Sequence, residues 1–522
     1  MNLGLMEIFH SFLPNFMMFV YFVFFVLLIY NWRSIKEPFG KIGKKTWIIL
    51  FVIIIFSFFV RFFWIPHEQV SMADGENWTE LGIRVKEYGI HAQCDFDTDE
   101  ECKVPSYIPY PPAYSTLLSF VFNFFETTEK TAFKFNALMG TLSVFIAFLF
   151  GYLYTKREYV ALFSAFVFSL IPPLLKFSGG VSPASFSVFF LLLTFVFLKI
   201  FSENKSKRAF LLLLSSLLIV IYIRPENIFL APIFLLMFAF EDNIKRFLDR
   251  EKVFFVLSFF VFSFSLIPSV MIVYFGSNIA GYEGWNPSIL ETAEYLLKHA
   301  PRNFYFLINP LVNSFVFSFF VIIGTIGVFL KEKKDFFLFS FILLFYFTLY
   351  SSFDAGIFWG PLARYSLPLY VPLFFFFIKG INYVLEKIKN KIALKVILIG
   401  ILFLFILSMI PTIPYIITEN GKNANLVKET LLLAKDKIPE DAYLISNVGS
   451  ATRAVINRKV VSVPHFENNS AYFENKDLFV FKNEAWFGLD GENYIYENYR
   501  LKPVETVTIG EREKGVYELI RK

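Results

Sequence analysis

The stretch RFFWIPHEQVSMADGENWTELGIRVKEYG, residues 61–89, begins at the end of an apolar run and carries a cluster of acidic side chains. Its central acid is followed at offsets of four, eight and fifteen by an aromatic residue and two glycines: Asp74, then Trp78, Gly82 and Gly89. Four-residue steps place side chains on one face of a helix, so the pattern predicts a packed helix below the acid. Asp74 is then either a catalytic base at a membrane surface or the N-cap of that helix.

The composition is that of a chain that crosses a membrane several times. Of its 522 residues, 56% are hydrophobic, 20% are aromatic and 18% are charged, and 73 are phenylalanine. Soluble domains are about 45–50% apolar and about 25% charged. The formal net charge of +5 comes mostly from basic residues in short loops between apolar runs. That distribution is typical of membrane proteins and not of a nucleic-acid-binding surface, so we expect a lipid bilayer and no nucleic acid as partner.

Apolar runs of about 20 residues are long enough to cross a bilayer, and they predict an all-α polytopic protein with about twelve transmembrane helices. The candidate spans are residues 10–31, 46–65, 131–154, 159–176, 183–201, 209–223, 227–241, 253–275, 311–330, 336–353, 366–384 and 392–415.

Lysine and arginine residues cluster in alternate loops between these spans. They occupy residues 33–45, 156–157, 205–208, 245–252, 331–334 and 387–395. All of these loops fall on one side of the membrane if the spans are correct, and the positive-inside rule makes that side cytoplasmic. We therefore predict a multi-pass protein of the cell membrane. Asp74, Arg224, the 354–365 loop and the C-terminus then lie on the extracytoplasmic side.

The first extracytoplasmic loop, residues 66–130, contains a short apolar segment at residues 110–125. Inserting this segment as a full span would reverse the sidedness of every later loop. We therefore expect a helix that begins at Pro111 and Pro112 and lies in the membrane interface. A re-entrant segment is the alternative.

The chain changes character after the last span, so we divide it into a transmembrane domain at 1–417 and an extracytoplasmic α/β domain at 418–522. An amphipathic helix is predicted at residues 424–437. Strand-like runs follow at residues 442–446, 459–463, 477–481, 504–509 and 515–519. About one hundred residues is a usual size for such a domain.

The two cysteines, Cys94 and Cys102, both lie in the first extracytoplasmic loop. Outside the cytoplasm a disulfide between them is the expected pairing, because two thiols alone make an incomplete metal site. His67 and Glu68 supply two possible metal ligands without a clear third. We therefore assign no metal ligands and no certain cofactor, and a divalent cation stays possible.

Three arginines recur on the predicted extracytoplasmic side, each close to proline or an aromatic residue: Arg61, Arg224 and Arg364. The guanidinium group presents a planar fork of donors that suits phosphate oxygens. Together with an acid, such groups suit a reaction on a phosphate-linked lipid, in which the acid accepts a proton and the arginines hold the leaving phosphate. The alternative for each arginine is that it reaches to the interface to keep its charge in water.

Four motifs in this order resemble the GT-C superfamily of polyprenyl-phosphate-sugar-dependent glycosyltransferases, in particular its protein mannosyltransferase and aminoarabinose transferase-like branch. They are D-G-E-N-W-x3-G-x6-G at Asp74–Gly89, Y-P-P-x-Y at Tyr110–Tyr114, R-P-E at Arg224–Glu226 and R-Y-S-L-P-L-Y-V-P at Arg364–Pro372. The resemblance implies that Asp74 is catalytic. The family often has adjacent Asp-Glu, whereas Gly75 separates Asp74 from Glu76 here, which puts the role of Glu76 in doubt.

The expected activity is an inverting transfer of a monosaccharide from a dolichyl or undecaprenyl phosphate donor to an acceptor hydroxyl. We predict Asp74 and Glu76 as catalytic residues. The residues predicted to bind the lipid phosphate and sugar are Arg224, Glu226, Arg364 and Tyr365. The acceptor is a glycan, a protein or a lipid. The alternative is a transporter or flippase of a lipid-linked sugar, but such proteins usually carry internal repeats and charges at mid-membrane, and the sequence shows neither.

Overall fold

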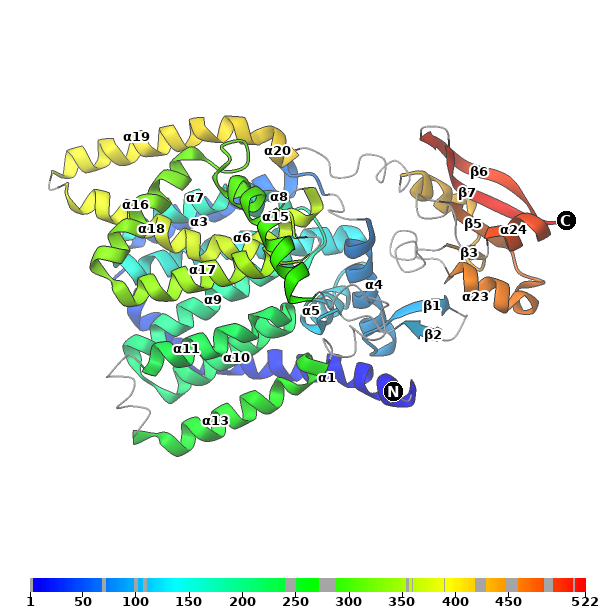
Figure 1. Ribbon diagram of the computed structural model, residues 1–522, viewed down its shortest axis with the longest axis horizontal. Helices are drawn as coiled ribbons and strands as arrows, with labels where there is room; N and C mark the ends of the chain where they lie inside the picture. Colours follow the sequence, from blue (N-terminus) through cyan, green and yellow to red (C-terminus); the bar gives the residue numbers. More distant parts are fainter. Residues whose placement is uncertain are drawn as a thin grey trace.

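The computed structural model describes residues 3–67, 72–97, 102–106, 110–239, 250–271, 288–353, 356–358, 360–388, 390–417, 429–446, 459–482, 492–509 and 512–522. A helical bundle forms one part and a small sheet domain the other (Figure 1). The bundle helices are α1 (Leu3–Tyr30), α2 (Trp32–Lys36), α3 (Lys44–Phe59), α4 (Met72–Tyr88), α5 (Pro112–Phe122), α6 (Glu129–Thr155), α7 (Glu158–Ser169), α8 (Pro172–Phe177), α9 (Pro183–Asn204), α10 (Lys207–Ile223), α11 (Leu230–Ala239), α13 (Lys252–Ser265), α15 (Ile289–Ile308), α16 (Phe315–Lys331), α17 (Lys333–Ser351), α18 (Tyr370–Glu386), α19 (Lys391–Met409) and α20 (Ile413–Ile417).

Within the described residues, each of the twelve predicted spans overlaps one of these helices or two consecutive ones. Among the described residues, eight helical segments are long and apolar enough to cross a membrane, and they contain α1, α3, α6, α9, α13, α17, α18 and α19. Helices α7, α10, α11 and α16 cover the other predicted spans and are shorter, at 10 to 17 residues. The polytopic all-α class is therefore confirmed, and within the described ranges eight helical segments reach the length of a full crossing.

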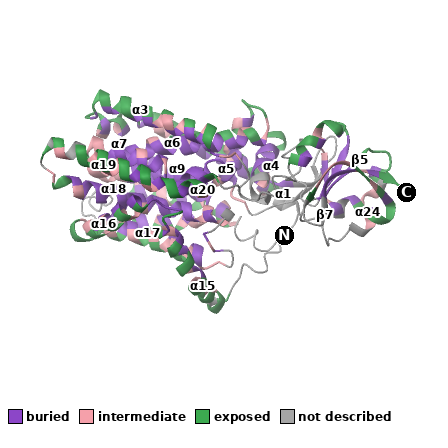
Figure 2. Cartoon of the chain, turned by 90° about the horizontal axis from the view of Figure 1, so that it is seen from above, coloured by how far each residue is buried: buried purple, intermediate pink, exposed green. Residues whose placement is uncertain are grey.

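The helices divide into a buried centre and a peripheral layer (Figure 2). The apolar windows of α9 and α18 are each 89% buried inside the protein, whereas those of α13 and α19 are 17% buried. A helix that is apolar all round must bury every face in protein or in lipid. Helices α9 and α18 therefore bury their apolar faces in protein, whereas α13 and α19 leave most of theirs exposed on the outside of the bundle.

Two glycines, Gly324 and Gly380, let helices α16 and α18 pack backbone against backbone. A Cβ atom at Gly324 of α16 would lie 1.7 Å from the carbonyl oxygen of Phe376 in α18, and one at Gly380 would lie 2.0 Å from the carbonyl oxygen of Phe320. Small residues at such crossings let the two backbones touch. The pair α16–α18 is thus fixed by reciprocal glycine contacts.

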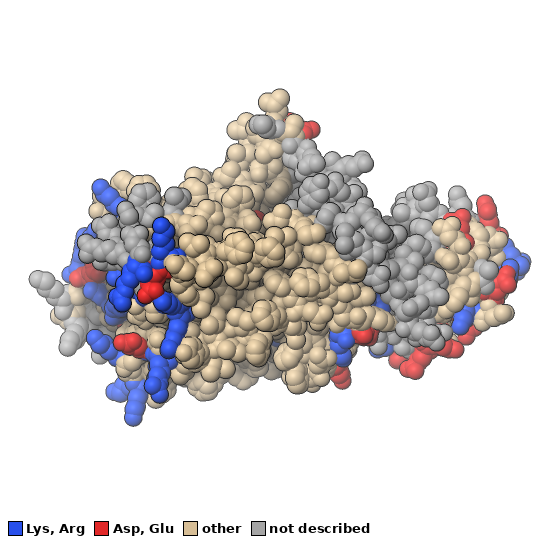
Figure 3. Space-filling model, turned by 90° about the horizontal axis from the view of Figure 1, so that it is seen from below, with Lys and Arg blue, Asp and Glu red and all other residues tan. Residues whose placement is uncertain are grey.

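Ion pairs join the loops that the sequence analysis assigned to one side of the membrane. Lys156 contacts Glu203 at 2.9 Å, Lys207 contacts Glu251 at 2.6 Å, and Lys331 contacts Glu386 at 3.6 Å. Lysine and arginine side chains accordingly gather at one end of the bundle (Figure 3). We call this end, formed by the chain around residues 43, 156, 204, 251, 332 and 386, the basic end. The predicted clustering of these loops is confirmed.

The apolar segment at residues 110–125 forms α5, which begins at Pro112 as predicted. Its surroundings are mostly protein, which neither the interfacial nor the re-entrant prediction specified. Tyr114 and Leu118 are fully buried, and α5 packs against α1, α4, α6 and α10. Because protein surrounds the helix on most sides, its stability comes from packing rather than from contact with lipid head groups.

The C-terminal part contains the predicted strands, which join a 7-stranded sheet of order β2-β1-β4-β3-β5-β7-β6. The strands are β1 (Gln93–Asp97), β2 (Cys102–Ser106), β3 (Tyr443–Ile445), β4 (Lys459–Val461), β5 (Leu478–Lys482), β6 (Tyr499–Ile509) and β7 (Arg512–Arg521). Strand β3 lies parallel between β4 and β5, and the hairpin β6–β7 is antiparallel. Residues 429–434 of the predicted 424–437 helix are helical, and 418–428 lie outside the described residues.

The sheet also contains a connection that the sequence did not predict. The hairpin β1–β2 belongs to the first loop after the acidic helix, yet β1 pairs antiparallel with β4, with Phe96 opposite Val461. Backbone hydrogen bonding of this kind does not depend on which side chains the two strands carry. The loop that follows α4 and the C-terminal domain therefore share one sheet.

Candidate active site

The segments that carry the sequence motifs lie at the end of the bundle opposite the basic end, because the helices that precede them start at the basic end. Helices α3, α10 and α17 each start at the basic end, with Lys44, Lys207 and Lys333. They therefore deliver α4, Arg224 and Tyr350 to the other end, which we call the site end. Segment η5 (Gly360–Leu369), which precedes α18, lies there as well.

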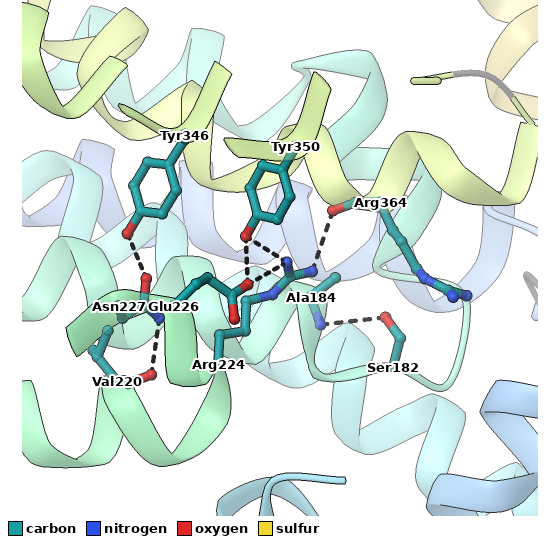
Figure 4. Close-up of polar contacts among 9 residues, drawn as sticks. All are labelled: Ser182, Ala184, Val220, Arg224, Glu226, Asn227, Tyr346, Tyr350 and Arg364. Atoms are coloured by element: carbon teal, nitrogen blue, oxygen red, sulfur yellow. Dashed lines mark hydrogen bonds and ion pairs between the residues drawn. The ribbon is translucent and has the colours of Figure 1, made fainter. Parts of the chain in front are cut away.

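A buried polar cluster surrounds Arg224 at the site end (Figure 4). Its Nη1 donates to the hydroxyl of Tyr350 at 2.9 Å and to Oε1 of Glu226 at 3.3 Å. The Tyr350 hydroxyl in turn donates to the same Glu226 oxygen at 2.5 Å. Arginine, tyrosine and carboxylate thus form a closed triangle, with Arg224 only 7% exposed.

The local sequence explains why the Arg224 side chain turns inward. Proline cannot donate a backbone hydrogen bond and forces the preceding residue into an extended conformation, and Arg224 has φ −147° and ψ 107°. Helix α10 ends there, and a 3-10 turn, η3 (Pro225–Phe229), starts. The turn brings the carboxylate of Glu226 back beside the guanidinium two residues earlier.

A neutral pair lies one helical turn away from the triangle. Tyr346 donates a short hydrogen bond to Oδ1 of Asn227, whose amide nitrogen donates to the carbonyl of Val220 at 2.9 Å. The rings of Tyr346 and Tyr350 lie 5.9 Å apart and nearly parallel, at 8°. This arrangement ties α17 to the turn after α10 through hydrogen bonds in the protein interior, where they are strongest.

The second motif reaches the same cluster from η5. Nη2 of Arg224 lies 3.4 Å from the carbonyl oxygen of Arg364, and the Tyr365 ring lies 5.7 Å from the Arg224 guanidinium. The guanidinium of Arg364 lies 5.2 Å from the Tyr365 ring. Its side chain extends away from Arg224 (Figure 4). The structure thus brings the predicted substrate-binding residues together but points the two guanidinium groups in different directions.

Sequence reasoning missed Tyr350, Tyr346 and Asn227. Tyr346 and Tyr350 are four residues apart on one face of α17, which is a signal for a shared face, but they stand among many other aromatic residues. Asn227 follows Glu226 directly, and nothing in the sequence distinguished it from an ordinary turn residue.

Asp74 and Glu76 lie in the first turns of α4, and their side chains lie outside the described part of the structure. Glu68 lies outside it as well. The helix that carries the two acids is firmly packed. Trp78 stacks on Tyr110 at 4.7 Å and 17°, so the sequence-predicted aromatic face of α4 does contact the Y-P-P-x-Y segment.

A buried ion pair that the sequence analysis did not single out stiffens α4. Nε of Arg84 lies 2.6 Å from Oε1 of Glu80, and both side chains are buried. A pair removed from water in this way is sensitive to the loss of either member, because the remaining charge would be left without compensation. It lies one and two turns beyond Glu76 on the same helical stripe.

Beyond α4, His91 connects the loop to the N-terminal helix and to α5. Its carbonyl lies 2.6 Å from Nδ1 of His10, and its ring contacts the Tyr110 carbonyl at 2.7 Å and the Ser115 hydroxyl at 3.1 Å. Complete burial lowers the pKa of His91 to about 3, and the neighbouring His10 lowers it further. The imidazole is therefore neutral at ordinary pH and acts as a hydrogen-bonded link.

The two cysteines lie on adjacent strands, with Cys94 opposite Pro105 and Cys102 opposite Asp97 in the β1–β2 register. Their side chains lie outside the described part of the structure, so the disulfide stays a prediction.

The burial of Arg61 contradicts the alternative that its side chain reaches to the membrane interface. Arg61 is 1% exposed and lies in a π-helical turn, Val60–Trp64, with its Nη1 bonded to Ser57. Such turns interrupt the regular hydrogen-bond ladder and often occur at functional sites. Nε2 of His67 lies 2.9 Å from the Arg61 carbonyl, so this ring nitrogen already has a contact within the protein. Among the described residues there is no group of three or more His, Cys, Asp or Glu that could hold a metal ion.

Comparisons with known proteins agree with this arrangement. Residues 109–270 match the family model described as dolichyl-phosphate-mannose-protein mannosyltransferase. No curated protein sequence matches the chain significantly. The crystal structure of ArnT from Cupriavidus metallidurans bound to undecaprenyl phosphate is similar with a TM-score of 0.58 and 12% identity, over 91% of this chain and 98% of that one.

Two further solved structures share the fold. ArnT from the same organism in the apo state has a TM-score of 0.59 and 11% identity, over 90% of this chain and 97% of that one. The Archaeoglobus fulgidus oligosaccharyltransferase with a tethered acceptor peptide has a TM-score of 0.54 and 12% identity, over 92% of this chain and 74% of that one. The chain therefore shares the fold of these membrane glycosyltransferases, and the family model matched by residues 109–270 supports the resemblance to the GT-C superfamily.

Proposed function

We propose that this protein transfers a monosaccharide from a polyprenyl phosphate to a hydroxyl group of an acceptor, with inversion, on the extracytoplasmic face of the membrane. The observation that carries the proposal is the buried cluster of Arg224, Glu226 and Tyr350 at the same end of the bundle as α4. A cation fixed at the end of a lipid-exposed bundle suits a ligand with an apolar tail and an anionic head. A similar fold binds undecaprenyl phosphate in ArnT.

The chemistry assigns different work to the acid and to the arginines. Asp74 accepts the proton of the acceptor hydroxyl as its oxygen attacks the anomeric carbon. The bond between that carbon and the phosphate oxygen breaks, and polyprenyl phosphate leaves with the electron pair. Preorganised cations stabilise the charge that develops on the leaving oxygen, where water is excluded and electrostatic interactions are strong.

The two arginines share the phosphate in unequal ways. Arg224 is held by Glu226 and Tyr350 through Nη1, while its buried Nε has no hydrogen-bond partner among the described residues. That Nε–H is a donor in a fixed position. Arg364 is partly exposed and lies on η5 next to Tyr365. We assign Arg224 to the preorganised charge, Arg364 to direct capture of the donor phosphate, and Glu226 and Tyr365 to holding the two guanidinium groups.

Glu76 is the second catalytic candidate.

The orientation in the membrane is inferred from the basic end. The loops that carry lysine and arginine meet there, and by the positive-inside rule the basic end faces the cytoplasm. The site end and the sheet domain then face outward. A glycan, a protein or a lipid serves as acceptor, and a divalent cation stays a candidate cofactor.

The decisive experiment compares Asp74→Asn with Glu76→Gln in purified protein reconstituted into liposomes, over a panel of lipid-phosphate-linked sugars. Asn caps a helix about as well as Asp, so donor binding should persist in Asp74→Asn while turnover falls by about 100-fold or more, the usual scale for loss of a general base. Glu76→Gln should lose less. Near-normal turnover in Asp74→Asn would place the base elsewhere.

The same preparation separates transfer from transport. A glycosyltransferase releases free polyprenyl phosphate in proportion to the glycosylated product. A flippase would move the intact lipid-linked sugar across the bilayer without releasing it. Donor movement in wild-type protein without any release, across the panel, would refute the proposed reaction.

A further inference from the structure

Helix α15 carries an exposed apolar stripe that the active site does not use. Leu290, Leu297, Phe304 and Ile308 are 82%, 78%, 58% and 50% exposed. They are spaced by seven, seven and four residues, so they lie along one face of the helix. A contiguous exposed apolar face on a folded protein usually marks a contact with a partner or a membrane.

The opposite face of α15 is fixed to the bundle. The side-chain nitrogen of Asn303 donates to the Ser351 hydroxyl at 2.8 Å and to the Gly356 carbonyl at 2.6 Å, and its oxygen accepts from the Phe358 amide at 2.8 Å. Phe306 is fully buried. Because these contacts set the rotation of the helix, the apolar stripe must point away from the bundle, and α15 projects from its side in Figure 2.

A second exposed stripe is charged. Glu294, Lys298 and Arg302 are spaced by four residues and all are exposed. With 3.6 residues per turn, this stripe lies between the apolar stripe and the packed face. The helix thus presents one face to the bundle, one polar face and one apolar face, which is the arrangement of a helix lying in a membrane interface.

The position of α15 identifies what covers its apolar stripe. Helix α16 ends at the basic end with Lys331, so its start at Phe315 and the preceding α15 lie at the site end. Leu311 is 57% exposed between them, and Phe315 and Ile322 continue the exposed apolar surface along α16. The stripe is therefore continuous with the exposed apolar surface of α16, which lies within the predicted span 311–330 and would face the hydrocarbon of the bilayer.

We propose that α15 is a membrane-surface helix whose stripe Leu290–Leu297–Phe304–Ile308 inserts into the bilayer at the site end. The polar stripe of Glu294, Lys298 and Arg302 faces water and lipid head groups. Since Asn303 also holds residues 356–358, just before η5, the docked helix fixes the level of the Arg364 segment relative to the lipid phosphates. This inference concerns a lipid contact outside the reaction site, and it stands whether or not sugar transfer is shown.

The test places an environment-sensitive nitrobenzoxadiazole probe on adjacent positions of the two stripes, as Leu297→Cys and Lys298→Cys, in the full-length chain in liposomes. Both positions are exposed, so the folded bundle tolerates the change, and the parent chain labelled in parallel measures any signal from the two native cysteines. Leu290→Cys and Glu294→Cys form a second matched pair in case one labelled variant does not fold.

The Leu297 probe should show blue-shifted emission and quenching by nitroxide-labelled phosphatidylcholine, with little quenching by aqueous iodide. The Lys298 probe should show the reverse. Equal quenching of both probes by iodide would mean that the stripe faces water and would overturn the proposal. Protection of the Leu297 probe from both quenchers would overturn it too, because protein, such as a second copy of the chain, would then cover the stripe.

Discussion

Tyr350→Phe isolates the contribution of a single oxygen atom to the cluster around Arg224. The substitution keeps the ring and its packing and removes the hydroxyl that donates to Glu226 at 2.5 Å and accepts from Arg224 at 2.9 Å. Tyr346→Phe is the matched control. It removes the same atom one turn earlier on α17, from a ring that is also buried, but its partner there is the neutral amide of Asn227.

The expected cost follows from the charge of the partners. A hydrogen bond to a charged group contributes about 1.5–3 kcal/mol, and a neutral one about 0.5–1.5 kcal/mol. Tyr350 makes two bonds to charged groups, while the direct contact between Arg224 and Glu226 at 3.3 Å survives its loss. We therefore expect Tyr350→Phe to lower the free energy of unfolding by about 3–4 kcal/mol and Tyr346→Phe by about 1–2 kcal/mol. The difference of about 2 kcal/mol corresponds to roughly 30-fold in the unfolding equilibrium.

The measurement is reversible unfolding of the purified protein in mixed micelles with increasing sodium dodecyl sulfate, followed by tryptophan fluorescence. Each variant is compared with wild type under the same lipid and detergent conditions, and folding is checked by size-exclusion chromatography. If Tyr350→Phe costs no more than Tyr346→Phe, the hydroxyl does not bridge the two charged groups, and the description of the cluster as a closed triangle is wrong.

Three further outcomes are expected. Gly324→Ala should destabilise the protein by about 1–3 kcal/mol, the usual cost of overpacking, since the new Cβ would lie 1.7 Å from the Phe376 carbonyl oxygen. The free energy of unfolding should fall as the pH drops from about 6.5 towards 3. Burial lowers the pKa of His91 to about 3 in the folded protein, so the unfolded state binds the proton first. Thermal unfolding of a His91→Gln variant should lack that part of the pH dependence. Mass spectrometry without reductant should find the two cysteines of the β1–β2 hairpin linked to each other.

Each of these outcomes has a control that can contradict it. Gly400→Ala adds the same methyl group to α19 where nothing lies within 4 Å, so equal losses in both glycine variants would exclude a packing effect. An unchanged pH profile in His91→Gln would assign the acid sensitivity to other groups. Complete alkylation of both cysteines under native, non-reducing conditions would exclude the disulfide.

Composition, periodicity and charge distribution were sufficient to predict the architecture. Apolar runs of membrane length define helices because the bilayer leaves each backbone donor and acceptor to be satisfied within its own segment. Loop charge then grouped the basic loops at one end of the bundle, and the ion pairs of Lys156 and Lys331 confirm that grouping. The strands of the C-terminal domain were also predictable, since alternating β-branched and aromatic residues between turns act locally.

The candidate site was predictable in part. Motif order identified the segments of Arg224 and Arg364, and the structure joins them through the Arg364 carbonyl. The partner Tyr350 lies 126 residues from Arg224 in the chain, and no local pattern distinguishes it from the other tyrosines. A hydrogen bond between distant residues depends on how helices are rotated against each other, which packing decides.

Three features were decided by the tertiary structure alone. Arg61 is buried rather than reaching to the interface, α5 is surrounded by protein, and β1 joins the sheet of the C-terminal domain. In each case the sequence specifies a group that is stable in more than one environment. These groups are the long basic side chain of Arg61, the apolar helix α5 and the open edge of strand β1. Sequence determined which elements form and at which end of the bundle they lie, because those properties follow from local hydrophobicity and charge. The surface against which each element is buried depends on contacts between distant segments, and only the folded chain provides them.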